Sequence, residues 1–189
     1  MRNIILASGS PRRRELLTTA GIPFEVRTSD ADERTELTDP AEVVQELSCR
    51  KCLDVLRQMP SGTVVLGADT IVAMDGTILG KPEDEADARN MLRRLAGRAH
   101  DVYTGVTIAE QTADGKLIRK QFAVRTSVQI GPLTEEEITA YILTGEPMDK
   151  AGAYGIQGVF SRHVEQISGD YFNVVGLPVH AVYEALKNW

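Results

Sequence analysis

Near its start the chain reads Ile4-Ile5-Leu6-Ala7-Ser8-Gly9-Ser10-Pro11-Arg12-Arg13-Arg14-Glu15-Leu16-Leu17. This stretch predicts a short buried strand, a tight turn and the start of a helix. Ser10 suits the N-cap position, because its hydroxyl can accept a hydrogen bond from an N–H of the first turn. Pro11 suits the first helical position, where no N–H is needed, and Gly21 suits the helix end. We therefore expect a helix directly after the turn at Ser8.

Three arginines, Arg12 to Arg14, fall in the first turn of this expected helix. Cations are disfavoured beside the positive end of a helix dipole. They are expected there when an anion is bound by the N–H groups and the guanidinium groups together. The stretch therefore indicates a polyanion site, most naturally for phosphate. A solvated basic turn with a purely structural cap is the alternative that these residues leave open.

The size and charge of the chain limit the classes of function. With 189 residues it can bury a sizeable core, and its net charge of -6 argues against non-specific binding to nucleic acid. A local basic pocket for a small phosphorylated ligand remains compatible with this acidic balance. No apolar run approaches the roughly 20 residues that span a bilayer, and no signal peptide is recognisable. We expect a cytoplasmic protein that binds neither nucleic acid nor membranes.

A second apolar run, Thr63 to Ala73, predicts a buried strand that is interrupted by Asp69. A carboxylate in such a place is costly unless it is paired or bound to a metal, which favours a functional role over a hydrogen-bonded turn. Lys81 stands between a glycine and a proline, where a ligand can approach the backbone closely. Further charged candidates for phosphate chemistry are Arg12, Arg13, Lys51 and Lys150, with the carboxylates of Glu33, Glu146 and Asp149.

The remaining pattern predicts an α/β or α+β protein with a mixed sheet. Strands are expected at Phe24–Ser29, His100–Ala109, Leu117–Ile130 and Val164–Ile167, hairpin turns at Asp75-Gly76 and Asp114-Gly115, helices at about 39–59, 83–97, 134–144 and 179–187, and loops at 145–158 and 169–178. Cys49 and Cys52 share a face of the second expected helix, which favours packing over redox or metal chemistry. The three histidines show no metal or triad spacing, so we expect them to be structural.

Six segments of the chain resemble the motifs of the Maf nucleotide pyrophosphatases, in the same order along nearly the whole sequence. They are Ser8-Gly9-Ser10-Pro11-Arg12-Arg13 with Glu15-Leu16-Leu17, Gly67-Ala68-Asp69-Thr70, Gly80-Lys81-Pro82, Thr104-Gly105-Val106, the stretch from Asp149 to Gly158, and Gly169-Asp170-Tyr171 with Asn173-Val174 and Gly176-Leu177-Pro178. Each motif alone is modest evidence, and together they are highly specific. Around Lys51 the chain has cysteines where the family usually has alanines, but the lysine is present.

The resemblance implies a fold and an activity. The fold is the α/β Maf/Ham1 (ITPase-like) fold, in which residues 1–189 form a single domain with an elongated mixed β-sheet, two lobes and a central cleft. The activity is hydrolysis of a nucleoside triphosphate to the monophosphate and diphosphate, with a divalent metal cation, Mg²⁺ or Mn²⁺, as cofactor. The resemblance is also compatible with a homodimer.

The resemblance further implies roles for individual residues. Asp69 matches the proton acceptor that activates water, and Glu33 matches an acidic position near the metal, so these two carboxylates are the expected metal ligands. Lys51 and Lys81 are expected to assist catalysis at the phosphates. The expected substrate-binding residues are Ser8, Ser10, Arg12, Arg13, Thr70 and Gln157.

Three of these positions indicate the substrate. Arg12, Thr70 and Gln157 resemble the branch of the family that acts on dTTP and UTP, and modified pyrimidine nucleotides are expected substrates as well. A glutamine amide offers one donor and one acceptor to a pyrimidine edge. The alternatives are the branch that acts on 7-methyl-GTP, an inosine-triphosphate pyrophosphatase of the same fold, and a non-catalytic nucleotide-binding regulator of cell division.

Overall fold

The structure is a computed structural model that describes residues 2–187 and 189, and these residues form a mixed sheet of seven strands with α-helices. The predicted α/β class is therefore confirmed. The strands are β1 (Ile4–Leu6), β2 (Phe24–Val26), β3 (Val64–Met74), β4 (Thr77–Leu79), β5 (Ala99–Gln111), β6 (Leu117–Ile130) and β7 (Val164–Ser168). Their hydrogen-bonded order is β2-β1-β3-β5-β6-β7, with β4 paired to β3 outside this path. β1 is parallel to β2 and β3, whereas the β3/β4 and β6/β7 pairs are antiparallel.

The helices agree with the predicted ones to within a few residues, with one addition. They are α1 (Pro11–Thr19), α2 (Pro40–Leu56), α3 (Glu85–Leu95), α4 (Glu135–Ile142), α5 (Tyr171–Val175) and α6 (Val179–Lys187). The prediction of a loop at 169–178 is wrong over α5. Asn173 anchors this helix by donating to the Val102 carbonyl at 3.1 Å and to Thr126 Oγ1 at 3.0 Å. Among the described residues, no helix has both the length and the apolar character needed to cross a membrane.

The predicted loop at 145–158 contains short 3₁₀ turns. They are η1 (Glu146–Asp149) and η2 (Ala151–Ala153), and a third, η3 (Val159–His163), follows directly. Gly152 inside η2 has a positive φ of 69°. A Cβ added to Gly152 would lie 3.0 Å from the Val72 side chain. This segment therefore depends on glycine both for its backbone conformation and for its packing.

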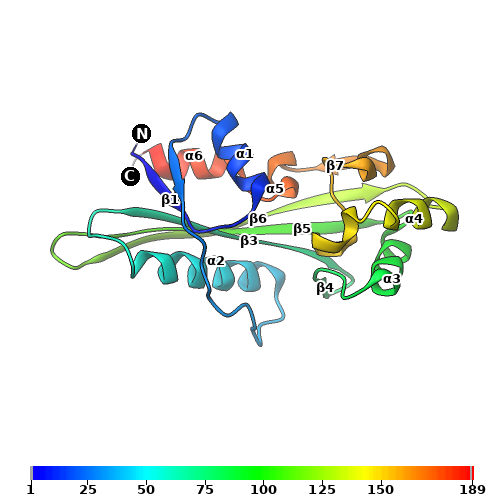
Figure 1. Ribbon diagram of the computed structural model, residues 1–189, viewed down its shortest axis with the longest axis horizontal. Helices are drawn as coiled ribbons and strands as arrows, with labels where there is room; N and C mark the ends of the chain where they lie inside the picture. The colour runs from blue at the N-terminus through cyan, green and yellow to red at the C-terminus, as the bar shows by residue number, and fades with distance from the viewer. Residues whose placement is uncertain (1, 188) are drawn as a thin grey trace. The chain divides into compact units, whose positions relative to one another are not determined.

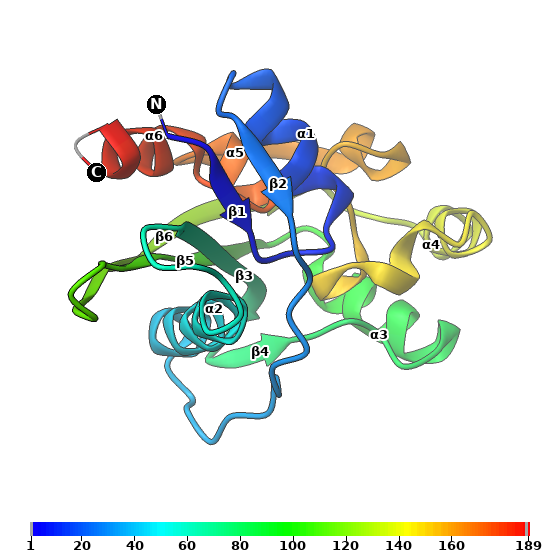
Figure 2. The same cartoon turned by 60° about the vertical axis from the view of Figure 1, so that its left-hand side comes forward.

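Two compact units make up the chain. The first comprises the residues up to Thr70, Thr104–Val124 and Gly176–Trp189, and the second comprises Ile71–Tyr103 and Arg125–Val175. Within the first unit, α2 covers one face of the strands, while α1 and α6 lie on the other face (Figures 1 and 2). Within the second unit, α3 packs against α4 and η2. The strands β3, β5 and β6 contribute residues to both units.

Helix α2 lies against bare backbone of the sheet at two glycines. A Cβ added at Gly67 of β3 would stand 2.7 Å from the Cys52 nitrogen, and one added at Gly105 of β5 would overlap the Val44 carbonyl. Ser48 Oγ also lies 2.9 Å from Thr107 Oγ1 of β5. These contacts fix the height of α2 above the strands.

Only one of the two cysteines packs in the core as predicted. Cys52 is fully buried between α2 and the sheet, and burial raises the pKa of its thiol to about 12. Cys49 is partly exposed, and its sulfur accepts a hydrogen bond from Arg119 at 3.2 Å. The prediction of a shared apolar face is therefore wrong for Cys49, which lies at the margin of the packed surface.

Helix α1 begins at Pro11 as predicted, but its cap differs from the expectation. Ser10 occupies the N-cap position with an extended backbone, and its side chain makes no capping hydrogen bond. Instead, the Ser10 N–H donates to Ser8 Oγ at 3.2 Å, because the turn folds back on itself. The helix end is as predicted, since Gly21 has φ +65° and its N–H donates to the Thr18 carbonyl.

Candidate active site

The site is built on the middle of β3. Strand β1 pairs with Val64–Leu66 of β3, and β4 pairs with Val72–Met74, so Asp69 and Thr70 lie between the two paired segments. Directly after β1, the Ala7 N–H donates a last hydrogen bond to the Leu66 carbonyl of β3. Beyond this bond the chain leaves the sheet and enters α1. The carboxyl ends of parallel strands are the usual ligand sites of α/β proteins. Successive side chains of a strand point to opposite faces, so Asp69 and Thr70 reach different partners.

On one face, a single ammonium group joins two carboxylates. Lys51 Nζ of α2 lies 2.6 Å from Asp69 Oδ1 and 2.7 Å from Glu33 Oε1. The side chains of Lys51 and Asp69 are 15% and 11% exposed, whereas that of Glu33 is 66% exposed. The costly carboxylate in the buried strand therefore has the partner that its position requires. The exposed Glu33 marks the side from which solvent or a ligand reaches the pair.

The loop that carries Glu33 is held on α2 by Arg50. The Arg50 guanidinium donates to the backbone carbonyls of Arg34 at 2.6 Å and of Asp32 at 3.2 Å, which are the two neighbours of Glu33 in sequence. These bonds position Glu33 over the next residue of the helix, Lys51. This supporting role of Arg50 was not predicted from the sequence, because only the contacts of the folded loop reveal it.

On the other face, Arg13 of α1 connects three segments of the first unit. It is only 9% exposed, and it donates from Nε to the Gly176 carbonyl at 2.8 Å. Its two terminal nitrogens donate to Ser8 Oγ at 3.0 Å and to Thr70 Oγ1 at 3.1 Å. Thr70 Oγ1 also lies 2.9 Å from Thr104 Oγ1 of β5. Arg13 therefore orients both Ser8 and Thr70.

Charge links the two faces of β3. Burial lowers the pKa of the Arg13 guanidinium, Asp69 and Glu33 oppose this shift, and Arg12 adds to it. Arginine nevertheless stays protonated in proteins, so Arg13 is a buried cation. The carboxylates that face Lys51 therefore also stabilise the positive charge of Arg13, and the two groups of side chains form one charged site.

The predicted site residues fall in both units. The first unit brings together Ser8, Arg13, Glu33, Lys51, Asp69 and Thr70. Arg12 is half-buried on α1, whereas Arg14 is exposed and donates to the Gly9 carbonyl at 2.7 Å. Lys81 and Gln157 are exposed and belong to the second unit. No role was predicted for Thr104 or Gly176, although both stand in motifs that resemble those of the Maf family.

The carboxylates of the site fit a divalent metal that arrives with a phosphorylated ligand. Among the described residues, no three His, Cys, Asp or Glu side chains form a ready metal site. Mg²⁺, however, is usually bound by one or two carboxylates together with substrate phosphates. Glu33 and Asp69, which share the Lys51 ammonium, supply a donor set of this kind.

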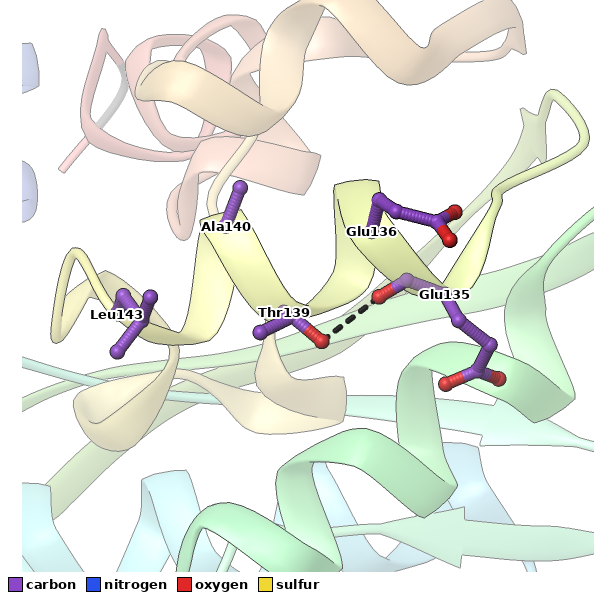
Figure 3. Close-up of a pocket in the computed structure, with 5 residues that line it drawn as sticks. All are labelled: Glu135, Glu136, Thr139, Ala140 and Leu143. Carbon is purple, nitrogen blue, oxygen red and sulfur yellow. Dashed lines mark hydrogen bonds between the residues drawn. The ribbon is translucent and has the colours of Figure 1, made fainter.

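Two features of the second unit lie outside this chemistry. His100 is 3% exposed, its Nε2 lies 2.8 Å from the Tyr154 hydroxyl, and burial lowers its pKa to about 4, which agrees with the structural role predicted for it. A shallow hollow of about 380 Å³ lies along α4 and is lined by Glu135, Glu136, Thr139, Ala140 and Leu143 (Figure 3). The Glu135 carboxylate is bound by Arg93 of α3, and the hollow holds none of the predicted site residues.

Known proteins resemble the chain over its whole length. Residues 3–189 match the family model described as Maf-like protein. A dTTP/UTP pyrophosphatase of Lachnoclostridium phytofermentans is 47% identical over 100% of this chain and 96% of its own length. A dTTP/UTP pyrophosphatase of Symbiobacterium thermophilum is 51% identical over 100% and 95%. Among solved structures, the Ham1 protein of Staphylococcus aureus is 13% identical with a TM-score of 0.46 over 99% of each chain.

Proposed function

Because the chain belongs to the Maf family, we propose that it hydrolyses dTTP and UTP to the nucleoside monophosphate and diphosphate. The resemblance that its motifs predicted is confirmed by the family match over residues 3–189. The observation that carries the proposal is the contact of Lys51 with Asp69 and Glu33, a cation between two carboxylates. One of these carboxylates, Asp69, precedes Thr70 on β3. Such a group suits water attack on a phosphoryl centre.

The triphosphate binds at the turn that precedes α1. The half-buried Arg12 contributes positive charge there, and Ser8 and Ser10 contribute hydroxyl groups. Arg13 acts mainly by orienting Ser8 and Thr70, since three of its nitrogens already donate to protein acceptors. The family resemblance also implies a role at the phosphates for Lys81.

Asp69 is the proposed base. Lys51 holds its carboxylate in place until phosphate oxygens compete for the same ammonium group. Asp69 then accepts a proton from the water that attacks the α-phosphorus, and Lys51 stabilises the charge that develops on the phosphate oxygens. When Mg²⁺ or Mn²⁺ is bound by Glu33 and Asp69, it supplies Lewis-acid stabilisation of the same charge.

We assign base selectivity to Thr70 and Gln157, together with Arg12 of the triphosphate turn. Thr70 is held by Arg13 and Thr104, so its hydroxyl has a fixed position. Gln157 offers an amide donor and acceptor that match a pyrimidine edge. With Arg12, these residues support the dTTP and UTP branch.

A substrate panel tests the proposal. The protein is incubated with dTTP, UTP, 7-methyl-GTP or ITP, each with Mg²⁺ or Mn²⁺, and inorganic pyrophosphatase converts the released diphosphate to phosphate for detection. We expect release from dTTP and UTP. Preferential release from 7-methyl-GTP or ITP would refute the substrate assignment. No release from any nucleotide would favour a non-catalytic nucleotide-binding regulator.

A further inference from the structure

Gln157 is carried by a tight turn of the second unit. The Gly158 N–H donates to the Gly155 carbonyl at 3.3 Å, which places Ile156 and Gln157 at the two central positions. Ile156 is only 8% exposed, whereas Gln157 is exposed. The buried Ile156 therefore anchors the turn to the protein, and the side chain of Gln157 is exposed to solvent.

The carboxylate of Glu146 is connected to both ends of this turn. Its Oε2 accepts a hydrogen bond from the Val159 N–H, just after the turn, at 3.0 Å. Its Oε1 accepts one from the Tyr141 hydroxyl at 3.0 Å. That hydroxyl in turn accepts from the Gly155 N–H, at the start of the turn, at 3.2 Å. Glu146 thus bridges the turn, directly at one end and through Tyr141 at the other.

The backbone of the turn closes around this carboxylate. A Cβ added at Gly158 would overlap the Glu146 carboxylate, and one added at Gly155 would lie 3.2 Å from its Oε1. The backbone carbonyl of Glu146 is itself held by Lys150 Nζ at 3.0 Å. Gly158 is therefore required for the close approach of the half-buried Glu146 carboxylate, and a side chain at Gly155 would also crowd it.

Tyr141 is a rigid link in this bridge. Its side chain is 1% exposed, and its ring packs on Phe160 with the ring centres 4.8 Å apart. Burial and the bond to Glu146 raise the pKa of its hydroxyl above the ordinary value. The hydroxyl therefore stays protonated and can donate to Glu146 while it accepts from Gly155.

We propose that Glu146 is a positioning residue for base recognition, because its carboxylate, together with the Tyr141 hydroxyl, fixes the turn that carries Gln157. The inference rests on the proposed function, in which Gln157 contacts the pyrimidine. An amide discriminates between bases only if its donor and acceptor are held in place, because ordering a mobile side chain weakens binding. Glu146 thereby acts on substrate affinity through Gln157 rather than on the chemical step.

The test compares Glu146→Gln with a matched control. The amide keeps the size of the side chain but cannot accept hydrogen bonds at both ends. We expect KM for dTTP to rise about tenfold, the order expected for one lost hydrogen bond to a charged group, with kcat changed less than about twofold. Glu136→Gln makes the same substitution on exposed α4 (Figure 3) and should leave both constants unchanged. An unchanged KM in Glu146→Gln, or a fall in kcat alone, would overturn the inference.

A second set of variants separates positioning from direct contact. In a Gln157→Ala background, Glu146→Gln should raise KM no further, since the residue through which it acts is gone. Additive effects would overturn the proposal. Tyr141→Phe keeps the ring on Phe160 and should raise KM in the same direction, which preserves the test if Glu146→Gln does not fold. A wild-type protein that fails to hydrolyse dTTP would refute the proposed function, and the inference with it.

Discussion

Arg13 offers a quantitative test of how α1 is joined to the turn at Ser8, to β3 and to the backbone at Gly176. Arg13→Lys keeps the charge but replaces a planar group of three nitrogens with a single ammonium. The three bonds, to the Gly176 carbonyl, Ser8 Oγ and Thr70 Oγ1, leave from three different nitrogens at 2.8, 3.0 and 3.1 Å. An ammonium can keep about one of them. Two lost bonds at about 1.5 kcal/mol each lower the free energy of unfolding by about 3 kcal/mol.

Urea unfolding and thermal melting measure this loss. Because Arg13 is 9% exposed, water cannot replace the lost partners freely. For a chain of this size, about 3 kcal/mol corresponds to a decrease in Tm of roughly 6–12 °C. Arg14→Lys is the matched control, because Arg14 is exposed and makes one bond to the Gly9 carbonyl, so the expected change is within about 0.5 kcal/mol. Equal stabilities of the two variants would refute the assignment of Arg13 as the connecting residue.

Three further predictions test Asp69 as the general base, the burial of His100 and the packing of α2 on the sheet. Asp69→Asn should lower kcat for dTTP by about 10²-fold or more with binding largely intact, and near wild-type turnover would refute the base assignment. Burial lowers the pKa of His100 from 6.5 to about 4, so between these values the unfolded chain binds a proton that the folded chain does not. Between pH 7 and pH 5 the free energy of unfolding of the wild type should therefore fall by about 2 kcal/mol more than that of His100→Gln. Urea titrations at the two pH values measure both decreases. Equal decreases would contradict this account. Gly105→Ala should destabilise the protein by about 1–3 kcal/mol, because its Cβ meets the Val44 carbonyl, whereas Gly80→Ala, with open space around it, should melt like the wild type.

Local signals made much of the fold predictable. Pro11 and Gly21 set the bounds of α1 through their own backbone preferences, whatever the rest of the chain does. Thr134 and Glu137 likewise form a capping box that marks the start of the helix predicted at 134–144. Asp69 could be singled out because a charge in a buried strand requires a partner. The family resemblance placed Lys51 at the phosphates, but its pairing with Asp69 was not predicted and is seen only in the structure.

Features that depend on distant residues were not predictable in this way. Helix α5 has five residues, which is too short to form on its own. It is held by hydrogen bonds from Asn173 to β5 and β6. The Ser10 hydroxyl was expected to cap α1, but the fold of the turn places Ser8 Oγ where the Ser10 N–H can reach it. No local pattern distinguishes Arg13, which is buried, from Arg14, which is exposed. Only the family motif separates these two arginines in advance.

The two glycines beneath α2 have a consequence for the affinity of the site. Because α2 packs directly on the backbone at Gly67 and Gly105, the Cα of Lys51 lies at a fixed distance from the sheet. Its ammonium group is already bound by Asp69 and Glu33. A free lysine side chain has rotamer entropy worth about 2 kcal/mol. Lys51 loses most of this freedom when the chain folds, so little remains to be lost when a nucleotide binds. Enlarging either glycine should therefore weaken nucleotide binding even in molecules that remain folded.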